Sequence, residues 1–154
     1  FKEVQKEHPD WELLLIGPER SPYCVEIENR IKDEGIKNAV VKINPSRYET
    51  LHDISSSKIL VSPSLHEGWG LTPIEGAILG TVPVMADIEV VEEYWGLNDT
   101  VFRFVKDDQT DFLDSVEIAI GEWSKGQPKI DIDTTEITPK SFAERFDKYL
   151  ENNL

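Results

Sequence analysis

The sequence predicts an α/β fold with a Rossmann-like, doubly wound parallel sheet. Apolar runs of five or six residues alternate with segments of helical periodicity along most of the chain. These runs are almost continuously apolar, which is typical of parallel strands that are covered on both faces. With 154 residues the chain fits a single domain, so residues 1–154 are expected to form one such unit.

Five strands are expected, at residues 11–16, 39–43, 58–62, 82–86 and 101–105. Most are rich in Val, Ile or Leu, and the last alternates Val and Phe with a basic residue. The first strand, WELLLI, is expected to be buried, and Gly17-Pro18 closes it with a turn. A predicted helix separates most strands from the next, as parallel pairing requires.

Helices are expected on both sides of the first strand. Residues 1–7 are typical of the end of a helix. Ser21 followed by Pro22 predicts the start of the next helix, and Gly35 is expected to end it. Cys24 lies on the apolar side of this helix, so we expect a buried thiol. As the single cysteine it excludes an intrachain disulfide, which agrees with a reducing, cytoplasmic location.

Two later helices begin with the spacing of a capping box. Ser46 and Glu49 predict a short helix that begins after the second strand. Thr72 and Glu75 have the same spacing, so a helix over residues 72–79 is expected to carry Glu75 in its first turn. In that arrangement the Glu75 carboxylate would accept a hydrogen bond from the Thr72 N–H.

The last third of the chain is expected to be helical, with one polar interruption. A short acidic helix should follow Asp87 and end near Trp95, and a longer one should begin at Thr110 with one apolar face. Residues 124–138 are polar and aperiodic, and are expected to form a connector across the surface. Residues 139–151 are expected to form a final helix.

The charge balance limits the possible partners. The formal net charge of −14 argues against nucleic acid and anionic membranes. No apolar run approaches the ~20 residues of a membrane span, and no signal peptide is recognisable, so membrane association is not indicated. Positive potential for an anionic ligand would have to come from a few cations or from outside the chain. The candidates are Arg20, Lys42, Arg47 and Lys58.

Polar groups gather where the third strand meets the helix at 72–79. In open α/β sheets, ligands bind at this carboxyl edge. Gly68 and Gly70 flank the loop beside Glu67, and they let backbone N–H groups approach a ligand closely because they lack a Cβ. The N-terminus of the following helix favours anionic groups such as phosphate. The sequence therefore predicts a binding site at this loop.

Residues 63–84 resemble the donor-site signature of retaining GT-B glycosyltransferases, especially family 4. They read P-S-x-x-E-G-W-G-L-x-x-x-E-x-x-x-x-G-x-x-P-V, with two glutamates separated by seven residues. Residues 8–19, HPDWELLLIGPE, are similar to the second strand of the family's C-terminal domain. The likeness covers about residues 1–122 and is strongest from 61 to 87. It implies transfer of a sugar from a nucleotide-sugar, with retention at the anomeric carbon.

The resemblance also implies roles for individual residues. Glu67 would be the catalytic group that touches the donor sugar, without acting as a nucleophile, and Glu75 would bind the ribose diol. The remaining donor-binding groups would be Gly68, Trp69, Gly70, Leu71, Thr72, Ile43 and Asn44. Glu75 could instead serve as a capping residue, Trp69 as a packing aromatic, and the loop at Ile43 and Asn44 as a plain turn.

Compared with the family's pattern, the chain begins after the first strand of the domain. That strand would lie centrally in the sheet, and its loop would bring an arginine and a lysine to the donor diphosphate. The N-terminal, acceptor-binding domain is also expected as a missing partner. We therefore expect this chain to be an inactive fragment of a two-domain enzyme.

No cofactor and no metal are expected beside the nucleotide-sugar substrate. The only Asp-x-Asp pair, Asp131 and Asp133, lies in the polar connector. Two other functions remain open on the sequence. One is a binding module that has kept nucleotide-sugar affinity without catalysis. The other is a different GT-B enzyme, such as an epimerase or a phosphorylase, although no lysine site for pyridoxal phosphate is recognisable.

Overall fold

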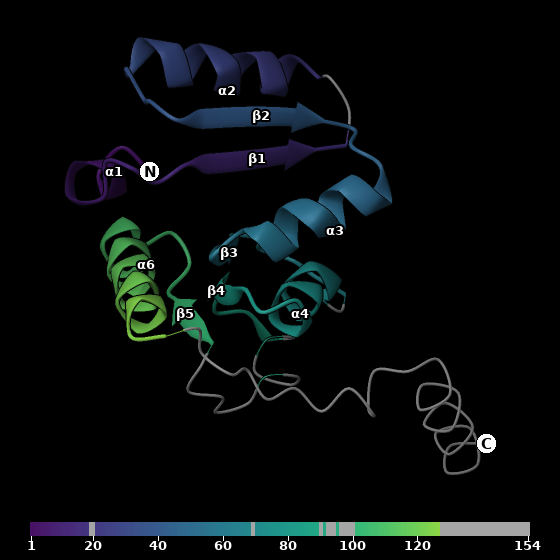
Figure 1. Cartoon of the computed structure of the whole chain (residues 1–154), viewed down its shortest axis with the longest axis vertical. Coiled ribbons are helices and arrows are strands. Elements are labelled where there is room, and N and C mark those ends of the chain that lie inside the picture. The colour runs from purple at the N-terminus through teal and green to yellow at the C-terminus, as the bar shows by residue number, and fades with distance from the viewer. Residues whose placement is uncertain (19–20, 69, 90, 92–94, 96–100, 127–154) are drawn as a thin grey trace.

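The computed structural model describes residues 1–18, 21–68, 70–89, 91, 95 and 101–126 (Figure 1). Its strands are β1 (Leu13–Gly17), β2 (Ala39–Ile43), β3 (Ile59–Ser62), β4 (Val82–Ala86) and β5 (Phe102–Phe104). Its helices are α1 (Val4–Glu7), α2 (Pro22–Asp33), α3 (Arg47–Ser56), α4 (Leu71–Ile78) and α6 (Gln109–Ser124). Outside the described residues lie Arg20, Trp69, Asp131, Asp133, most of the connector, the helix at 139–151 and much of the short acidic helix.

The α/β, Rossmann-like fold expected from the sequence is confirmed. β1 pairs with β2, β3 with β4, and β4 with β5, and each pair is parallel. The predicted bounds of β2 and β4 match the structure, whereas β1 begins two residues later than expected. Ser21 accepts a hydrogen bond from the Cys24 N–H at the start of α2, and Ser46 and Glu49 form the predicted capping box of α3.

The sheet is interrupted between β1 and β3. The described strands form a two-stranded sheet, β1–β2, and a three-stranded sheet, β3–β4–β5. β1 and β3 therefore each have one edge without a partner strand in the described part of the chain.

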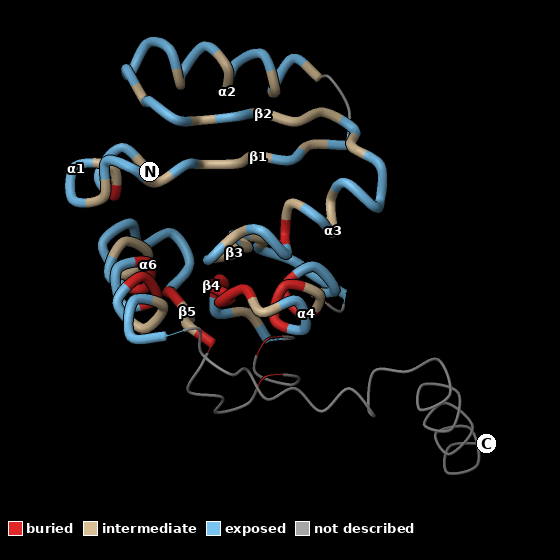
Figure 2. The backbone as a smooth tube through the Cα atoms, in the orientation of Figure 1, coloured by how far each residue is buried: buried red, intermediate tan, exposed pale blue. Residues whose placement is uncertain are grey.

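Two predictions of burial are wrong for this reason. β1 was expected to be buried, but its residues are half-buried, and Ile16 is exposed. Cys24 on α2 is also only half-buried, because α2 packs on a sheet of two strands and has no fully buried residue. Figure 2 shows this contrast between α2, β1 and β2 and the rest of the chain.

The hydrophobic core lies around β4. All five residues of β4 are buried, as expected for a strand with neighbours on both edges. α6 packs on one side through Val116, Ala119 and Ile120, and Val4 of α1 joins the same cluster. A second cluster, around Ile74 and Ala77 of α4, also includes Trp95. The red segments of Figure 2 mark these regions.

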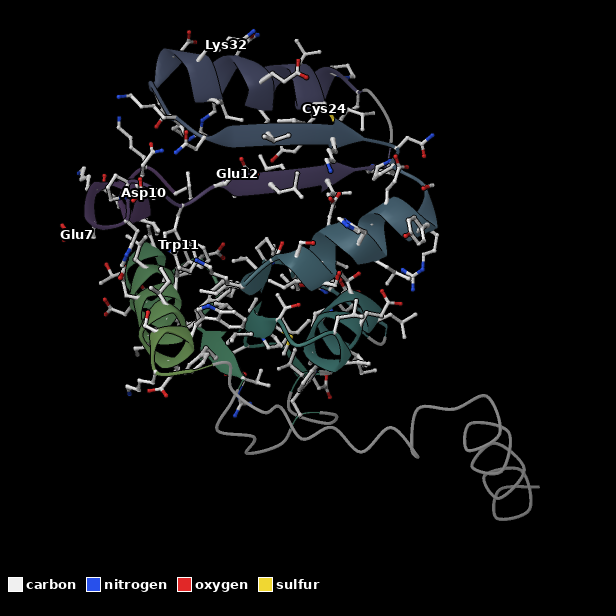
Figure 3. The ribbon with its side chains drawn as sticks, viewed as in Figure 1. Glu7, Asp10, Trp11, Glu12, Cys24 and Lys32 are labelled. Atoms are coloured by element: carbon white, nitrogen blue, oxygen red, sulfur yellow. The ribbon has the colours of Figure 1, made fainter. Side chains whose placement is uncertain are left out.

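Contacts from the N-terminal segment connect the two sheets. Trp11 lies just before β1 and near α6 (Figure 3), and the Lys58 ammonium at the start of β3 stands 4.9 Å from its ring centre. His8 Nε2 lies 2.8 Å from the Glu117 carboxylate on α6. The Gln5 side chain donates to and accepts from the backbone of Lys37, next to β2. These contacts lie toward the amino ends of the strands.

Candidate functional site at the carboxyl edge of β3

The helix behind the glycine loop begins earlier than the sequence indicates. α4 starts at Leu71, and its N-cap is Gly70, with φ of 60° and no side-chain cap. The expected capping box between Thr72 and Glu75 is therefore wrong. Gly70 makes the left-handed turn that starts the helix, a conformation that glycine adopts without steric cost. With Gly70 as the N-cap, a capping-box glutamate would have to stand at position 73, which is Pro73. Glu75 lies two residues too far along α4 for this role.

Glu67 lies in the wall of a hollow at the carboxyl ends of β3 and β4. The hollow is shallow and opens to solvent; its empty space is about 280 Å³ when the open solvent in it is included. Its lining residues are Ser62, Ser64, Glu67, Gly70, Pro73, Met85, Ala86, Ile88, Val91 and Trp95. The floor is mainly apolar, whereas Glu67 and the two serines supply polar groups. The sequence reasoning missed the lining residues from β4 onward, because nothing in their spacing connects them to the glycine loop.

Glu75 lies on the side of α4 that faces α3, outside the lining of the hollow. Its carboxylate accepts two hydrogen bonds from the Arg47 guanidinium, one from Nη1 to Oε2 at 2.9 Å and one from Nη2 to Oε1. The Glu75 side chain is 23% exposed and that of Arg47 is 63% exposed. The hydrogen bond to Glu75 raises the pKa of Arg47, which remains a cation. Because 28 residues separate the two, no local motif predicts this pair.

The backbone between the two glutamates presents N–H groups at the surface. Gly68, Leu71 and Thr72 are exposed, and the N–H groups in the first turn of an α-helix have no partner within the helix. Pro73 contributes none, because its nitrogen carries no hydrogen. The helix dipole adds positive potential at this end. Leu71 and Thr72 are therefore the two first-turn donors of α4 that could meet an anionic group.

The loop after β2 reaches the same edge of the fold. Ile43 ends β2, and Asn44 follows in a left-handed conformation, with φ of 49°. The Asn44 N–H donates to the Gly17 carbonyl at the end of β1, 2.7 Å away. This bond fixes where the chain leaves the sheet, and Arg47 then begins α3. Figure 1 shows α3 beside α4.

A family model described as glycosyl transferases group 1 matches residues 1–129. The chain belongs to this family. Its relatives include GDP-mannose:cellobiosyl-diphosphopolyprenol alpha-mannosyltransferase of Xanthomonas oryzae pv. oryzae, 26% identical over 54% of this chain and 22% of that protein. The O-antigen chain mannosyltransferase RfbU of Salmonella typhimurium is 29% identical over 60% of this chain and 27% of that protein. The chain thus spans about a quarter of these curated relatives.

The fold of this family member is also found in a solved structure. The crystal structure of TarM superposes with a TM-score of 0.67 over 82% of this chain and 25% of that chain. The sequences are 19% identical, so this similarity concerns the fold alone. Together with the family match and the parallel strands, it agrees with the GT-B C-terminal domain fold expected from the sequence.

Two of the four cations that could supply positive potential, Lys42 and Lys58, have other partners. Lys42 Nζ donates to both carboxylate oxygens of Asp53, at 2.7 and 2.8 Å. Lys58 lies over Trp11 at the opposite edge of the sheets. Arg47 is therefore the one candidate cation that the described part of the chain places against a predicted donor-site residue.

The described residues hold no cluster of three or more His, Cys, Asp or Glu side chains that could bind a metal ion. Among the same residues, no helix is long and apolar enough to cross a membrane.

Proposed function

We propose that this chain is the donor-binding half of a retaining glycosyltransferase that transfers a sugar from a nucleotide-sugar to an acceptor. One observation carries the proposal. Glu67 and Glu75 lie on either side of the start of α4, at the carboxyl edge of parallel strands. A hollow opens beside the first glutamate, and the loop after β2 approaches the second through Arg47. A nucleotide-sugar has separate sugar, phosphate and ribose groups. Glu67, the start of α4 and Glu75 could bind these three groups in that order.

Each group of the site then has a role that suits its chemistry. The Glu67 carboxylate can accept hydrogen bonds from sugar hydroxyls and stabilise positive charge near the anomeric carbon. The N–H groups from Gly68 to Thr72 can bind phosphate oxygens at the start of α4. The Glu75 carboxylate can accept a hydrogen bond from each of the two hydroxyls of the ribose diol. The backbone at Ile43 and Asn44 is then available to the nucleobase. None of these roles requires a metal.

The interrupted sheet supports the proposal that the working enzyme has further parts. One more parallel strand would give β1 and β3 a partner on their open edges and would complete a continuous sheet. Its loop would reach the carboxyl edge between β1 and β3, close to the hollow. The relatives are about four times as long as the segment that matches, and we propose that the complete enzyme also supplies an acceptor-binding domain.

The names of the relatives suggest which donor to test first. Both are described as mannosyltransferases, and one name specifies GDP-mannose. We therefore take GDP-mannose as the first candidate, with UDP-glucose and ADP-glucose as alternatives. A thermal-shift titration of the complete protein should reveal stabilisation by one of the three, since a ligand that binds only the folded state raises the unfolding midpoint. The shift should weaken in a Glu75→Ala variant. If no nucleotide-sugar shifts the midpoint of a well-folded protein, the proposed function is wrong.

A further inference from the structure

Arg47 is hydrogen-bonded to the carboxylate of Glu75, which the proposed function assigns to the donor ribose. The two guanidinium nitrogens meet one carboxylate oxygen each, in the planar fork that arginine forms with carboxylates. The main chain at Arg47 is fixed, because the capping box of Ser46 and Glu49 holds the first turn of α3. The Arg47 side chain itself is mostly exposed, so it can leave Glu75 without disturbing the core.

The ribose diol and the Arg47 fork compete for the same oxygens. A vicinal diol that binds a carboxylate through both hydroxyls places one donor against each oxygen, as the fork does. Glu75 cannot hold both partners in this geometry. Donor binding therefore has to displace the guanidinium, or else the diol contact cannot form.

A displaced guanidinium would remain close to an anion. Glu75 lies four residues after Leu71, which is roughly 6 Å along the axis of α4 at the usual helical rise. The start of α4 is where the diphosphate is proposed to bind, and the diphosphate is attached to the same ribose. Arginine binds phosphate oxygens well. Lys42 is held by Asp53 and Lys58 by Trp11, so Arg47 is the best-placed cation among the described candidates.

We propose that Arg47 is an exchange residue of the donor site. In the empty site it holds Glu75, and in the occupied site it moves to the donor diphosphate while Glu75 takes the ribose diol. This proposal rests on the proposed function. It assigns a donor-binding role to a residue on α3, outside the glycine loop, and it makes the positive charge of the site depend on the state of Glu75.

Titrations with and without phosphate groups test the exchange in the complete protein. The ligands are guanosine and GDP, uridine and UDP, and adenosine and ADP, and the pair whose base binds is used for the variants. Arg47→Gln removes the charge and the fork. Its dissociation constant for the nucleoside diphosphate should rise about tenfold, because a charge-assisted contact is lost. Its dissociation constant for the nucleoside should fall about two- to fivefold, because Glu75 no longer has to release an exposed ion pair.

Two further variants serve as controls. Arg47→Lys keeps the charge but not the fork, so its affinity for the nucleoside diphosphate should stay within about threefold of the wild type. Arg30→Gln breaks a comparable exposed pair, Arg30 with Glu34 at 3.2 Å, near the end of α2 and toward the amino ends of the strands. It changes the net charge equally and should alter neither affinity.

The outcomes separate the two proposals. Opposite shifts for the nucleoside and its diphosphate in Arg47→Gln support the exchange. Shifts in the same direction, or none, overturn the exchange and leave the proposed function standing. If Arg30→Gln lost as much affinity for the nucleoside diphosphate as Arg47→Gln, the exchange would be overturned too. The loss would then be explained by the change in net charge alone. If the well-folded wild type binds no nucleoside diphosphate, the proposed function fails, and the exchange fails with it.

Discussion

Glu67 precedes α4 and Glu75 lies within it, and their surroundings suggest different contributions to turnover. Glu67 is exposed in the wall of the hollow, and no residue in the described part of the chain forms a hydrogen bond or ion pair with its carboxylate. Glu75 is mostly covered and already forms an ion pair with Arg47. The first position suits a group that acts on the reacting sugar, and the second suits a group that binds a remote part of the donor.

Glu67→Ala in the complete enzyme should mainly lower kcat, whereas Glu75→Ala should mainly raise KM for the donor. Contacts at the reacting sugar strengthen in the transition state, but remote contacts stabilise ground and transition state alike. Each charge-assisted hydrogen bond that is lost costs roughly 1.5–3 kcal/mol, a factor of about 10 to 150. Steady-state kinetics with varied donor concentration measure this split, with circular dichroism to confirm folding. Wild-type kinetics in Glu67→Ala would contradict its assigned role.

The two glycines of the loop should respond differently to substitution. Gly70 has φ of 60°, so Gly70→Ala strains the backbone by about 1 kcal/mol although a Cβ would meet no atom within 4 Å. Gly68 has neither a positive φ nor a close neighbour, so Gly68→Ala should leave the free energy of unfolding nearly unchanged. Its added methyl should still weaken donor binding if the backbone approaches the ligand here. Urea unfolding and donor titration of both variants provide the comparison. Equal stabilities would refute the assignment of strain to Gly70.

Among the elements, the start of α3 depends on one ionised side chain. The Ser46 hydroxyl, and then the Ser46 backbone N–H, lower the pKa of Glu49 below the ordinary value for glutamate. A carboxyl whose folded-state pKa is lowered stabilises the fold above its unfolded pKa. This contribution is lost as the pH falls through the lowered pKa.

Glu49→Gln should therefore be less stable than the wild type at neutral pH, and the difference should shrink on acidification. Thermal unfolding midpoints measured from about pH 7 to about pH 3 give the difference curve. The capping box places Glu49 against the first turn of α3, so helix content should report the same loss. A stability difference that stays constant with pH would show that the ionised carboxylate does not hold this turn.

Local patterns in the sequence predicted most elements but not their long-range contacts. The capping box of α3 and the bounds of β2 and β4 depend on neighbouring residues, and all three were predicted correctly. The start of α4 was wrong because Gly70 could equally end a loop or begin a helix. The Arg47–Glu75 pair could not be predicted, because it depends on how two helices pack. The half-exposed β1 could not be predicted from apolarity, because exposure depends on which strands flank it.

At the scale of the whole molecule, the two open strand edges bear on how well this chain binds a donor by itself. The strand proposed to fill the gap would bring further groups to the diphosphate, and the net charge of −14 disfavours an anionic ligand. A closing acceptor domain would also position the reacting groups, which can lower a barrier by several kcal/mol.

The 154-residue chain alone should therefore bind a nucleotide-sugar with a dissociation constant on the order of 1 mM, about −4 kcal/mol, and should transfer no sugar. The complete protein should bind at least about tenfold more tightly. Calorimetry on both proteins, followed by a transfer assay with mixed acceptors, measures the difference. Low-micromolar binding or measurable transfer by the chain alone would show that it is a functional unit without further parts.

The central claim is that the donor binds at the carboxyl edge of β3, between the glycine loop and the loop after β2. Hydrogen exchange of the complete protein, measured by mass spectrometry with and without a saturating nucleotide-sugar, tests this most directly. We predict that the donor slows exchange in peptides covering residues 66–75 and 43–47, and leaves α2 and α6 unchanged. Protection confined to other segments, in a protein that demonstrably binds the donor, would contradict the claim.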